Sequence, residues 1–305
     1  IQRNNIIIDG NGYLIQGSGG GDGLSLSSRS NVTIRNMRIQ NFTQGIYLYS
    51  SSNIRIYGNN ISSSIDMLYY ESSIYIHASS YTMISGNSLD NENNIRLYGS
   101  SYNNVSGNSI RGTNTYSAYG IWIEGYYGAS CSYNNIVENN ITNCLSGIWL
   151  DEASSNNNIT KNSITGCSGG IYFYASSSNS ISGNNIASNT NGFHITWSSS
   201  YNNISINNIT GNYRGFYITS YCSHNIIVGN NITSNGFGIE ISDSSDNSIY
   251  HNNFISNTYW QVYVYNVPNF WDDGYPSGGN YWSDYTGLDI NGDGLGDNLV
   301  PHLGL

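Results

Sequence analysis

A repeat of about 22 residues is the feature of this sequence that most constrains its fold. Its marker is an apolar residue that follows an asparagine by two places in every unit after the first, and successive markers lie 22, 28, 21, 31, 23, 22, 23, 23 and 22 residues apart. A unit this short cannot bury an apolar face alone, so the units must stack into one continuous core. The markers are Ile39, Ile61, Leu89, Ile110, Ile141, Ile164, Ile186, Ile209, Ile232 and Phe254.

The residue types in the repeat select one kind of solenoid. Helical solenoids need longer repeats of about 33 to 47 residues, and the leucine spacing of leucine-rich repeats is missing. Isoleucine with asparagine in every unit fits short stacked strands, because stacked asparagines bond to one another along the axis. The sequence therefore predicts an all-β fold, a right-handed, single-stranded parallel β-helix of about 11 rungs. The expected ladder asparagines are Asn59, Asn87, Asn108, Asn139, Asn162, Asn184, Asn207, Asn230 and Asn252.

The repeat ends near Tyr265, and a segment of different composition follows it. This segment contains all three prolines of the chain and the tryptophans Trp271 and Trp282. The end of a β-helix exposes strand edges that must be covered or paired. We therefore divide the chain into a β-helix over residues 1–265 and a C-terminal cap over residues 266–305.

Charged residues make up only 9% of the chain, and the formal net charge is −10. Nucleic-acid binding is not expected, because it requires clustered lysine and arginine. No apolar run approaches the roughly 18 residues of a membrane span. With 28 tyrosines and so little charge, the chain is expected to be glycosylated, to associate, or both.

The C-terminal segment contains a run of oxygen ligands spaced as in the first part of a calcium loop. Asp289, Asn291, Asp293 and Asp297 occupy its positions 1, 3, 5 and 9, and a glycine occupies position 6. The acid at position 12 of an EF-hand is replaced by Val300, so a shorter, structural Ca2+ loop is predicted. The alternative is a cluster of turn residues with no ion.

The chain resembles a known family. Its rungs, with Asn-Asn-Ile followed by Gly-Ile-x-Ile, look like the NosD-like parallel β-helix repeats, which occur in many archaeal cell-surface proteins. The tail NFWDDGYPSGGNYWSDYTGLDINGDGLGD is similar to the closing segment of those proteins. The resemblance implies the fold and an exported, cell-surface location. The family is named for copper maturation, but the five histidines here lack close paired spacing, so no copper role is expected.

One column of the repeat places large side chains at the same rung position. Its neighbours on both sides are apolar, so by strand alternation the column points outward. A strip of exposed aromatic rings could bind sugars, contact another subunit, or only stack between rungs. The candidate residues for glycan binding or a subunit interface are Tyr47, Tyr75, Trp122, Trp149, Tyr172, Tyr217 and Tyr263, and the column also contains Arg96, His194 and Glu240.

The carboxylates Glu124 and Asp151 lie on successive rungs, each two residues after the column residue of its own rung, Trp122 or Trp149. Paired carboxylates roughly 5 to 9 Å apart could catalyse glycoside hydrolysis, and Arg96 is the best available basic partner for a lyase. Outward acids on a solenoid are more often only solvated, so the chain is not expected to be an enzyme.

The four cysteines form two pairs by rung position. Cys144 and Cys167 are 23 residues apart, which places them on adjacent rungs within reach of a disulfide, with two buried thiols as the alternative. Cys131 and Cys222 share a position four rungs apart, too far for a bond within one chain. If exposed on one edge, these two would cross-link neighbouring subunits, and otherwise they are free thiols.

Nine asparagines stand in Asn-x-Ser/Thr sequons, some of which the repeat itself imposes. An exported chain with this many sequons is expected to be glycosylated. They are Asn31, Asn41, Asn60, Asn104, Asn140, Asn158, Asn203, Asn208 and Asn231.

The leading functional hypothesis is an extracellular structural protein of a microbial cell envelope, self-assembling as a sheath, surface layer or filament. Low charge, the aromatic column and the absence of a convincing catalytic constellation favour it. The first rung, with Ile6 and Ile8, is expected to take part in assembly because little precedes it to cover its edge. The alternatives are a carbohydrate-binding adhesin and a polysaccharide-active lyase or hydrolase.

Overall fold

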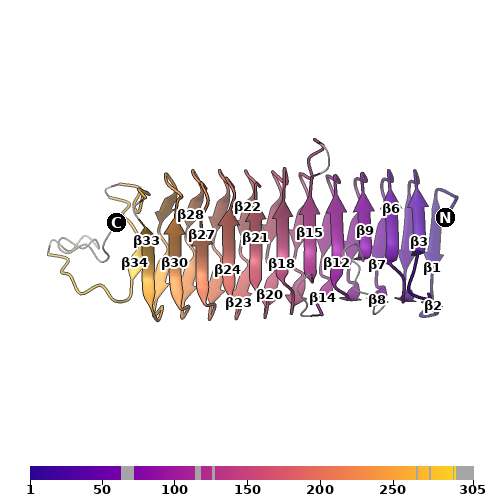
Figure 1. The fold of residues 1–305 in the computed structure, drawn as a ribbon, viewed down its shortest axis with the longest axis horizontal. Coiled ribbons are helices and arrows are strands. Elements are labelled where there is room, and N and C mark those ends of the chain that lie inside the picture. Colours follow the sequence, from indigo (N-terminus) through magenta and orange to yellow (C-terminus); the bar gives the residue numbers. More distant parts are fainter. Residues whose placement is uncertain are drawn as a thin grey trace.

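The computed structural model describes residues 1–62, 72–113, 118–125, 128–265, 267–274, 276–290 and 292. These residues form a right-handed parallel β-helix, a long stack of rungs with the first rung at one end and the C-terminal segment at the other (Figure 1). Each complete rung contributes one strand to each of three parallel sheets. The predicted fold class and the number of about 11 rungs are therefore confirmed.

The first sheet, sheet A, is made of short strands with one buried residue in the middle of most of them. Ile56, Ile84 and Val105 occupy this position on consecutive rungs and are fully buried. The strands are β1 (Ile6–Asp9), β4 (Val32–Arg35), β7 (Arg55–Tyr57), β10 (Met83–Ser85), β13 (Asn104–Ser106), β16 (Asn135–Val137), β19 (Asn158–Thr160), β22 (Ser180–Ser182), β25 (Asn203–Ser205), β28 (Ile226–Val228) and β31 (Ser248–Tyr250).

Sheet B contains the apolar markers of the repeat, which pair with one another from rung to rung. Its strands are β2 (Leu14–Gln16), β5 (Arg38–Gln40), β8 (Asn60–Ser62), β11 (Ser88–Asp90), β14 (Ser109–Arg111), β17 (Asn140–Thr142), β20 (Ser163–Thr165), β23 (Asn185–Ala187), β26 (Asn208–Thr210), β29 (Asn231–Thr233), β32 (Asn253–Ile255) and β34 (Tyr281–Trp282).

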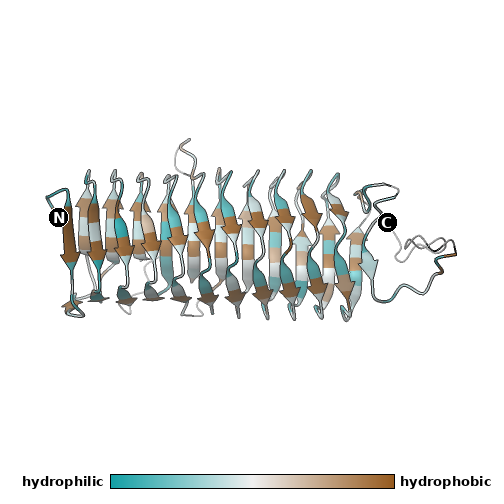
Figure 2. Cartoon of the chain, turned by 180° about the vertical axis from the view of Figure 1, so that it is seen from behind, coloured by the Kyte–Doolittle hydropathy of each residue, from teal (hydrophilic) through white to brown (hydrophobic). Residues whose placement is uncertain are grey.

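Sheet C has the longest strands, and most of them bury two apolar residues. Its strands are β3 (Asp22–Ser27), β6 (Gln44–Tyr49), β9 (Ser72–His77), β12 (Asn93–Tyr98), β15 (Tyr119–Glu124), β18 (Ser146–Asp151), β21 (Gly169–Tyr174), β24 (Asn191–Thr196), β27 (Arg214–Ile218), β30 (Phe237–Ser242) and β33 (Trp260–Tyr265). Brown and teal bands on neighbouring strands show the apolar and polar columns of the rungs (Figure 2).

Glycine is required at the second position of many sheet C strands because the rungs approach closely there. A Cβ atom on Gly170 would lie 2.5 Å from the carbonyl oxygen of Gly192 in the next rung, and 2.7 Å from the side chain of Ile186. This contact explains the Gly-Ile-x-Ile element of the repeat.

The predicted asparagine ladder is present, and two further asparagine ladders run beside it. In the predicted ladder the Nδ2 atom of each asparagine donates to Oδ1 of the next one, as in Asn139 to Asn162 and Asn162 to Asn184, each at 3.0 Å. Each Oδ1 also accepts from the backbone N–H of the preceding asparagine. The second ladder runs through Asn103, Asn134, Asn157, Asn179, Asn202, Asn225, Asn247 and Asn269, and the third through Asn189, Asn212, Asn235 and Asn257.

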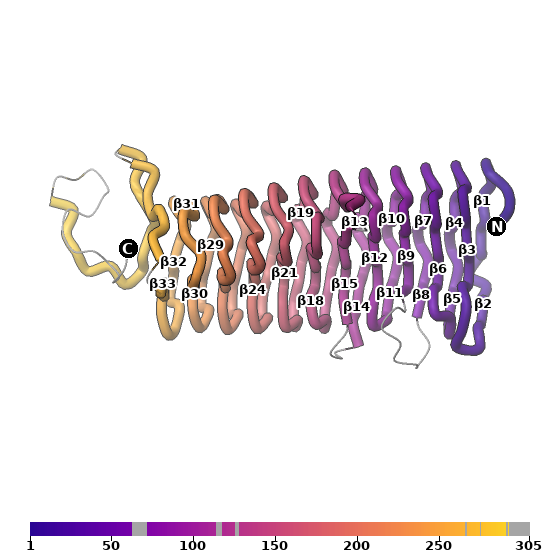
Figure 3. The backbone as a smooth tube through the Cα atoms, turned by 45° about the horizontal axis from the view of Figure 1, so that its top comes forward, coloured from indigo at the N-terminus to yellow at the C-terminus, as the bar shows by residue number. Residues whose placement is uncertain are grey.

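The C-terminal segment continues beyond the last full rung (Figure 3). Asn269 and Asn280 extend two of the asparagine ladders into it, and β34 pairs with β32. Trp282 stacks on Phe254 with ring centroids 4.4 Å apart, which covers the end of the core. The division at residues 265 and 266 stays a prediction, since both the ladders and sheet B continue past it.

Candidate functional site

Sheet C presents three columns of outward residues, and the predicted aromatic column is the middle one. Strand register aligns Tyr47 with Tyr75, and Trp122 with Trp149 and Tyr172, which confirms the column. The expectation that the column forms an exposed strip is wrong for most of it. Arg96 and Trp122 are only 6% exposed, and Tyr263 is the member with an exposed side chain, at 42%. The flanking columns shield the rings between them.

The centre of the middle column is a stack of cationic and aromatic side chains. The guanidinium carbon of Arg96 lies 4.1 Å from the ring centroid of Trp122. Trp122 in turn stacks on Trp149 with centroids 4.9 Å apart and ring planes 8° apart, and Tyr119 packs against both indoles. The faces that could bind a sugar or a neighbouring subunit are thus partly occupied within the chain.

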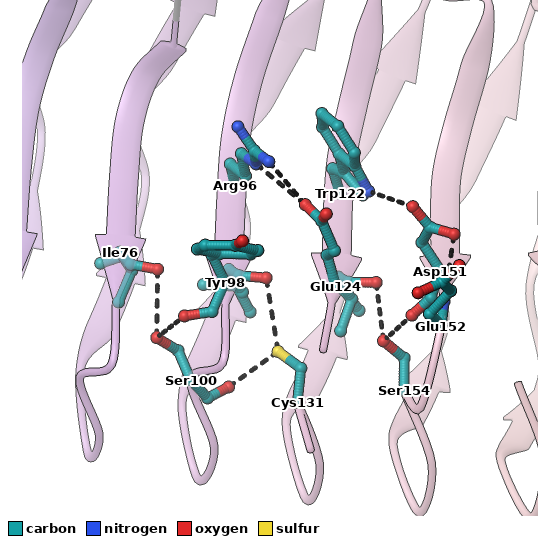
Figure 4. Close-up of polar contacts among 12 residues, drawn as sticks. Ile76, Arg96, Tyr98, Ser100, Trp122, Glu124, Cys131, Asp151, Glu152 and Ser154 are labelled. Atoms are coloured by element: carbon teal, nitrogen blue, oxygen red, sulfur yellow. Dashed lines mark hydrogen bonds and ion pairs between the residues drawn. The ribbon is translucent and has the colours of Figure 1, made fainter. Parts of the chain in front are cut away.

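Glu124 and Asp151 are in register on adjacent rungs, beside this stack (Figure 4). Arg96 forms an ion pair with Glu124 at 2.6 Å, as the sequence suggested. Trp122 donates its indole N–H to Asp151 Oδ2 at 3.3 Å, and the backbone N–H of Glu152 donates to Asp151 Oδ1 at 3.0 Å. The two carboxylates therefore have different partners, a cation for one and neutral donors for the other.

These partners give the two acids different proton affinities. Burial and the nearby Glu124 carboxylate raise the pKa of Asp151 to about 6. Burial also raises the pKa of Glu124, but the Arg96 guanidinium opposes that shift. Two neighbouring carboxyl groups with different proton affinities are the arrangement that general acid–base chemistry on a glycosidic bond requires.

A hollow of about 340 Å³ lies next to the indole stack, on the outer face of β15, β18, β21 and β24. It exists because the first outward column changes from large to small residues and back again. Tyr119 and Arg214 are separated in this column by Ser146, Gly169 and Asn191. We call this feature the aromatic hollow, and it is lined by Tyr119, Leu145, Ser146, Trp149, Ser168, Gly169, Tyr172, Thr190, Asn191 and His194.

Two buried polar atoms of the lining lack a hydrogen-bond partner among the described residues. They are the indole nitrogen of Trp149, a donor, and Oδ1 of Asn191, an acceptor. Unpaired buried polar atoms cost about 1 to 3 kcal/mol each, so a ligand that hydrogen-bonds to them would recover that cost. His194 adds a ring that is uncharged at neutral pH, because burial and the nearby Arg214 lower its pKa to about 4.

Arg96, packed against the rings of Tyr98 and Trp122, forms an arginine cage on one side of the hollow, and a second arginine cage lies on the far side. Arg214 forms an ion pair with Glu240 and lies 4.9 Å from the ring centroid of Tyr213 and 4.8 Å from that of Tyr217. The hollow, Tyr119 and Arg214 were not identified from the sequence. The signal was present in the first outward column, but aligning that column requires the register across two long insertions.

The predicted intermolecular disulfide between Cys131 and Cys222 is contradicted, because both side chains are fully buried. They occupy a column that is serine on other rungs, such as Ser100 and Ser154, and their thiols donate to backbone carbonyls as those hydroxyls do. A thiol replaces a hydroxyl here with little change in shape, so the cysteines are interior residues and not edge residues.

Cys144 and Cys167 are adjacent, as expected, but they are free thiols in this structure. The backbone N–H of Cys144 donates to Cys167 Sγ at 3.4 Å, and the N–H of Cys167 donates to Asn189 Oδ1. The pair therefore begins the third asparagine ladder, with sulfur in place of the amide. A disulfide between them stays a prediction.

The predicted calcium loop falls largely outside the described residues, which exclude Asn291, Asp293 and Asp297. Asp289 is described, and its Oδ1 accepts from the backbone N–H of Gly292 at 2.7 Å. Among the described residues, no three His, Cys, Asp or Glu side chains converge as metal ligands would. Calcium binding stays a prediction.

The nine predicted glycosylation sites lie on the outside of sheets A and B or next to their strands. Seven of them are the first residue of a strand, as Asn60 is in β8. In four of them Nδ2, the atom that would carry a glycan, donates to an asparagine of the preceding rung. Those four are Asn31, Asn158, Asn208 and Asn231, and glycosylation of any of the nine stays a prediction.

Solved structures with a similar fold come from several kinds of protein. The A-module of the mannuronan C-5 epimerase AlgE6 of Azotobacter vinelandii matches with a TM-score of 0.61 and 13% identity, over 84% of this chain and 81% of that one. DFA-IIIase from Arthrobacter chlorophenolicus matches with a TM-score of 0.61 and 10% identity, over 85% and 89%. The Dettilon tailspike matches with a TM-score of 0.55 and 16% identity, over 83% and 61%.

No curated protein matches the sequence. Among the described residues there is no helix long and apolar enough to cross a membrane. Two family comparisons match, each over more than half of the chain. The right-handed β-helix region matches residues 22–186, and the family described as periplasmic copper-binding protein (NosD) matches residues 125–287.

The family's description raises the question of copper. Copper sites use histidine, cysteine and methionine ligands in convergent sets. No set of three converging His or Cys side chains occurs in the part of the chain that the structure describes, so these residues do not fit such a site. The repeat, the three-sheet solenoid and the two matches agree, and the chain belongs to the NosD-like family of right-handed parallel β-helix proteins.

Proposed function

We propose that this protein binds carbohydrate on the outer face of sheet C, at the aromatic hollow. The observation that carries the proposal is the lining of the hollow. Rings of Tyr119, Trp149 and Tyr172 stand beside hydroxyl and amide groups of Ser146 and Asn191. Binding pockets of about 300 to 1,000 Å³ with mostly apolar walls and a few convergent polar groups are typical of small-ligand sites. Apolar sugar faces and sugar hydroxyls match such a lining.

The kinds of protein with a similar solved structure support this proposal. Two of them are enzymes of carbohydrates, a mannuronan epimerase and a DFA-IIIase determined in complex with GF2. The family description is periplasmic. We therefore place the proposed activity outside the cytoplasm, at the cell surface or in the extracellular space.

Filling the hollow tests the proposal. Gly169 is the best position, since a Cβ atom there meets only ordinary contacts, the nearest being Ser146 Oγ at 3.5 Å. The same register position is occupied by Tyr119 and Phe237 on other rungs, so the fold accepts an aromatic residue. We expect Gly169→Phe to weaken binding to a panel of immobilised polysaccharides by at least about tenfold, or 1.4 kcal/mol.

Gly169→Ala is the matched control, because it adds a Cβ atom and leaves the hollow open. It should bind as the unaltered chain does. Equal binding by the phenylalanine variant, with unchanged circular dichroism, would show that the sugar does not occupy the hollow.

A polysaccharide-active enzyme is the second candidate, and the pair of Glu124 and Asp151 favours it. Burial raises the pKa of both carboxyl groups, but Arg96 opposes the shift of Glu124, whereas Asp151 has no cationic partner among the described residues and its pKa rises to about 6. Release of reducing ends or unsaturated products from a bound polysaccharide, lost in both Glu124→Gln and Asp151→Asn, would support catalysis. If the chain binds the polysaccharide at pH 5 and at pH 7 but releases no product, the result contradicts catalysis and supports binding alone.

Self-assembly in a cell-envelope sheath, surface layer or filament is a separate proposal. The middle column of sheet C does not support self-assembly, because Trp122 and Arg96 are covered by their own chain. Its remaining support is the low charge of the sequence and exposed aromatic residues such as Tyr201 and Tyr221. Sedimentation of the purified chain tests it, with a monomer over the accessible concentration range as the contradicting result.

A further inference from the structure

The charges around the aromatic hollow bear on which kind of carbohydrate it accepts. None of its ten lining residues carries a charge at neutral pH, because His194 is neutral there. A hollow that bound uronic or sulfated sugars would need unpaired cations within its walls or at its rim.

The two arginines of the outer face do not meet that need. Arg96 and Arg214 stand on opposite sides of the hollow, five rungs apart, or about 24 Å at the usual strand spacing. Each is neutralised by its own glutamate, Glu124 in one case and Glu240 in the other. Each guanidinium also lies against aromatic rings of its own cage.

The charges that stay unpaired near the hollow are negative. Within the described part of the chain, Asp151 and Glu152 form no ion pair, and they lie two and three residues beyond the hollow's Trp149. The whole chain has a formal net charge of −10. Like charges repel across a partly desolvated surface, so an anionic polymer would meet an unfavourable potential along this face.

We propose that the aromatic hollow is selective for neutral polysaccharides and discriminates against uronic-acid polymers. This inference rests on the proposed function, since it names the ligand class of the same site. The two ion-paired cages act as uncharged walls at the ends of the site. The unpaired carboxylates beside Trp149 supply the discrimination.

The test is calorimetric titration with hexasaccharides of equal length. The neutral probes are cellohexaose, mannohexaose and laminarihexaose, and the acidic probes are hexamers of galacturonate and mannuronate. We expect at least one neutral probe to bind at least about tenfold more tightly than either acidic probe. Its affinity should change less than about threefold between 50 and 500 mM NaCl, because no ion pair forms on binding.

The variant Glu152→Gln tests the source of the discrimination, because it removes one unpaired, exposed carboxylate and leaves Glu124 and Asp151 unaltered. It should strengthen binding of the acidic hexamers several-fold and leave the neutral ones unchanged. Tighter binding of an acidic probe by the unaltered chain would overturn the inference while keeping carbohydrate binding. Absence of binding by all five probes, or equal binding by Gly169→Phe, would instead overturn the proposed function itself.

Discussion

The asparagine ladders and the outer face of β15 to β24 differ in how completely their polar atoms are paired. Within the ladders, each internal side-chain amide donates to the next rung and accepts from the preceding one, as Asn162 does. On the outer face, Trp149 and Asn191 present buried atoms without partners among the described residues, and Asp151 and His194 have strongly shifted pKa values. The first region is built for stability, and the second retains unmet interactions that a ligand could satisfy.

Removing one ladder amide should lower the free energy of unfolding the most. Asn162→Ala would leave two donors of Asn139 without their acceptor and would remove the bond to Ile136 O. Since each unsatisfied buried group costs about 1 to 3 kcal/mol, we expect the free energy of unfolding to fall by about 3 to 5 kcal/mol. Urea denaturation measures it.

Asn158→Ala is the control on the same rung, since Asn158 is exposed and makes a single bond to Asn135. It should cost less than about 0.5 kcal/mol. Similar losses for the two variants would mean that the buried ladder does not stabilise the stack more than surface bonds do.

Substitutions of the two stacked tryptophans should change stability by less, but the two changes should differ from each other. Trp122→Phe removes a bond to Asp151 and should destabilise the chain by about 1 to 2 kcal/mol more than Trp149→Phe does. Trp149→Phe removes an unpaired donor, so its loss of ring area is offset by relief of that cost. Thermal unfolding of both variants compares them, and the reverse order would show that Trp149 has a partner in solution.

The pH dependence of stability separates two residues beside the stack. The folded pKa of Asp151, about 6, lies above its unfolded value of 3.8, so its contribution falls as pH rises between those values. The folded pKa of His194, about 4, lies below its unfolded value of 6.5, so its contribution falls as pH drops through that window.

The two contributions oppose each other between pH 4 and pH 6. Asp151→Asn should make the slope of unfolding free energy against pH more positive, and His194→Gln should make it more negative. Because both groups are partly solvated, we expect each effect to be about 1 kcal/mol over the window. Denaturation at pH 4, 5 and 6 measures the slopes, and shifts of the same sign would refute the assignment.

The stacking of this molecule could be predicted from the sequence because each rung repeats the same physical requirements. The spacing of the apolar markers determines the register of sheet B, and strand alternation then gives the outward direction of Trp122 and Trp149. The exposure of the side chains in the middle column could not be predicted this way, because the three outward columns of sheet C shield one another.

The hollow and the cysteine environment required a register that the sequence hides. Insertions of unequal length lie between Ile61 and Leu89 and between Ile110 and Ile141, so the first outward column with Ser146 and Gly169 could not be aligned reliably. Cys131 and Cys222 share their rung position with serines of other rungs, and this substitution pattern indicates a buried thiol in place of a hydroxyl.

All the amides of the main ladder point the same way along the axis. From Asn59 to Asn252, each side-chain amide donates one N–H to the oxygen of the next asparagine towards the C-terminal rung, and each oxygen accepts from the N-terminal side. Their dipoles therefore add, as peptide dipoles do in an α-helix, and each bond polarises the next. A β-sheet ordinarily has little net dipole, so this solenoid acquires from its side chains an axial electrical polarity. Its two ends differ in potential, with partial positive charge towards the C-terminal rung.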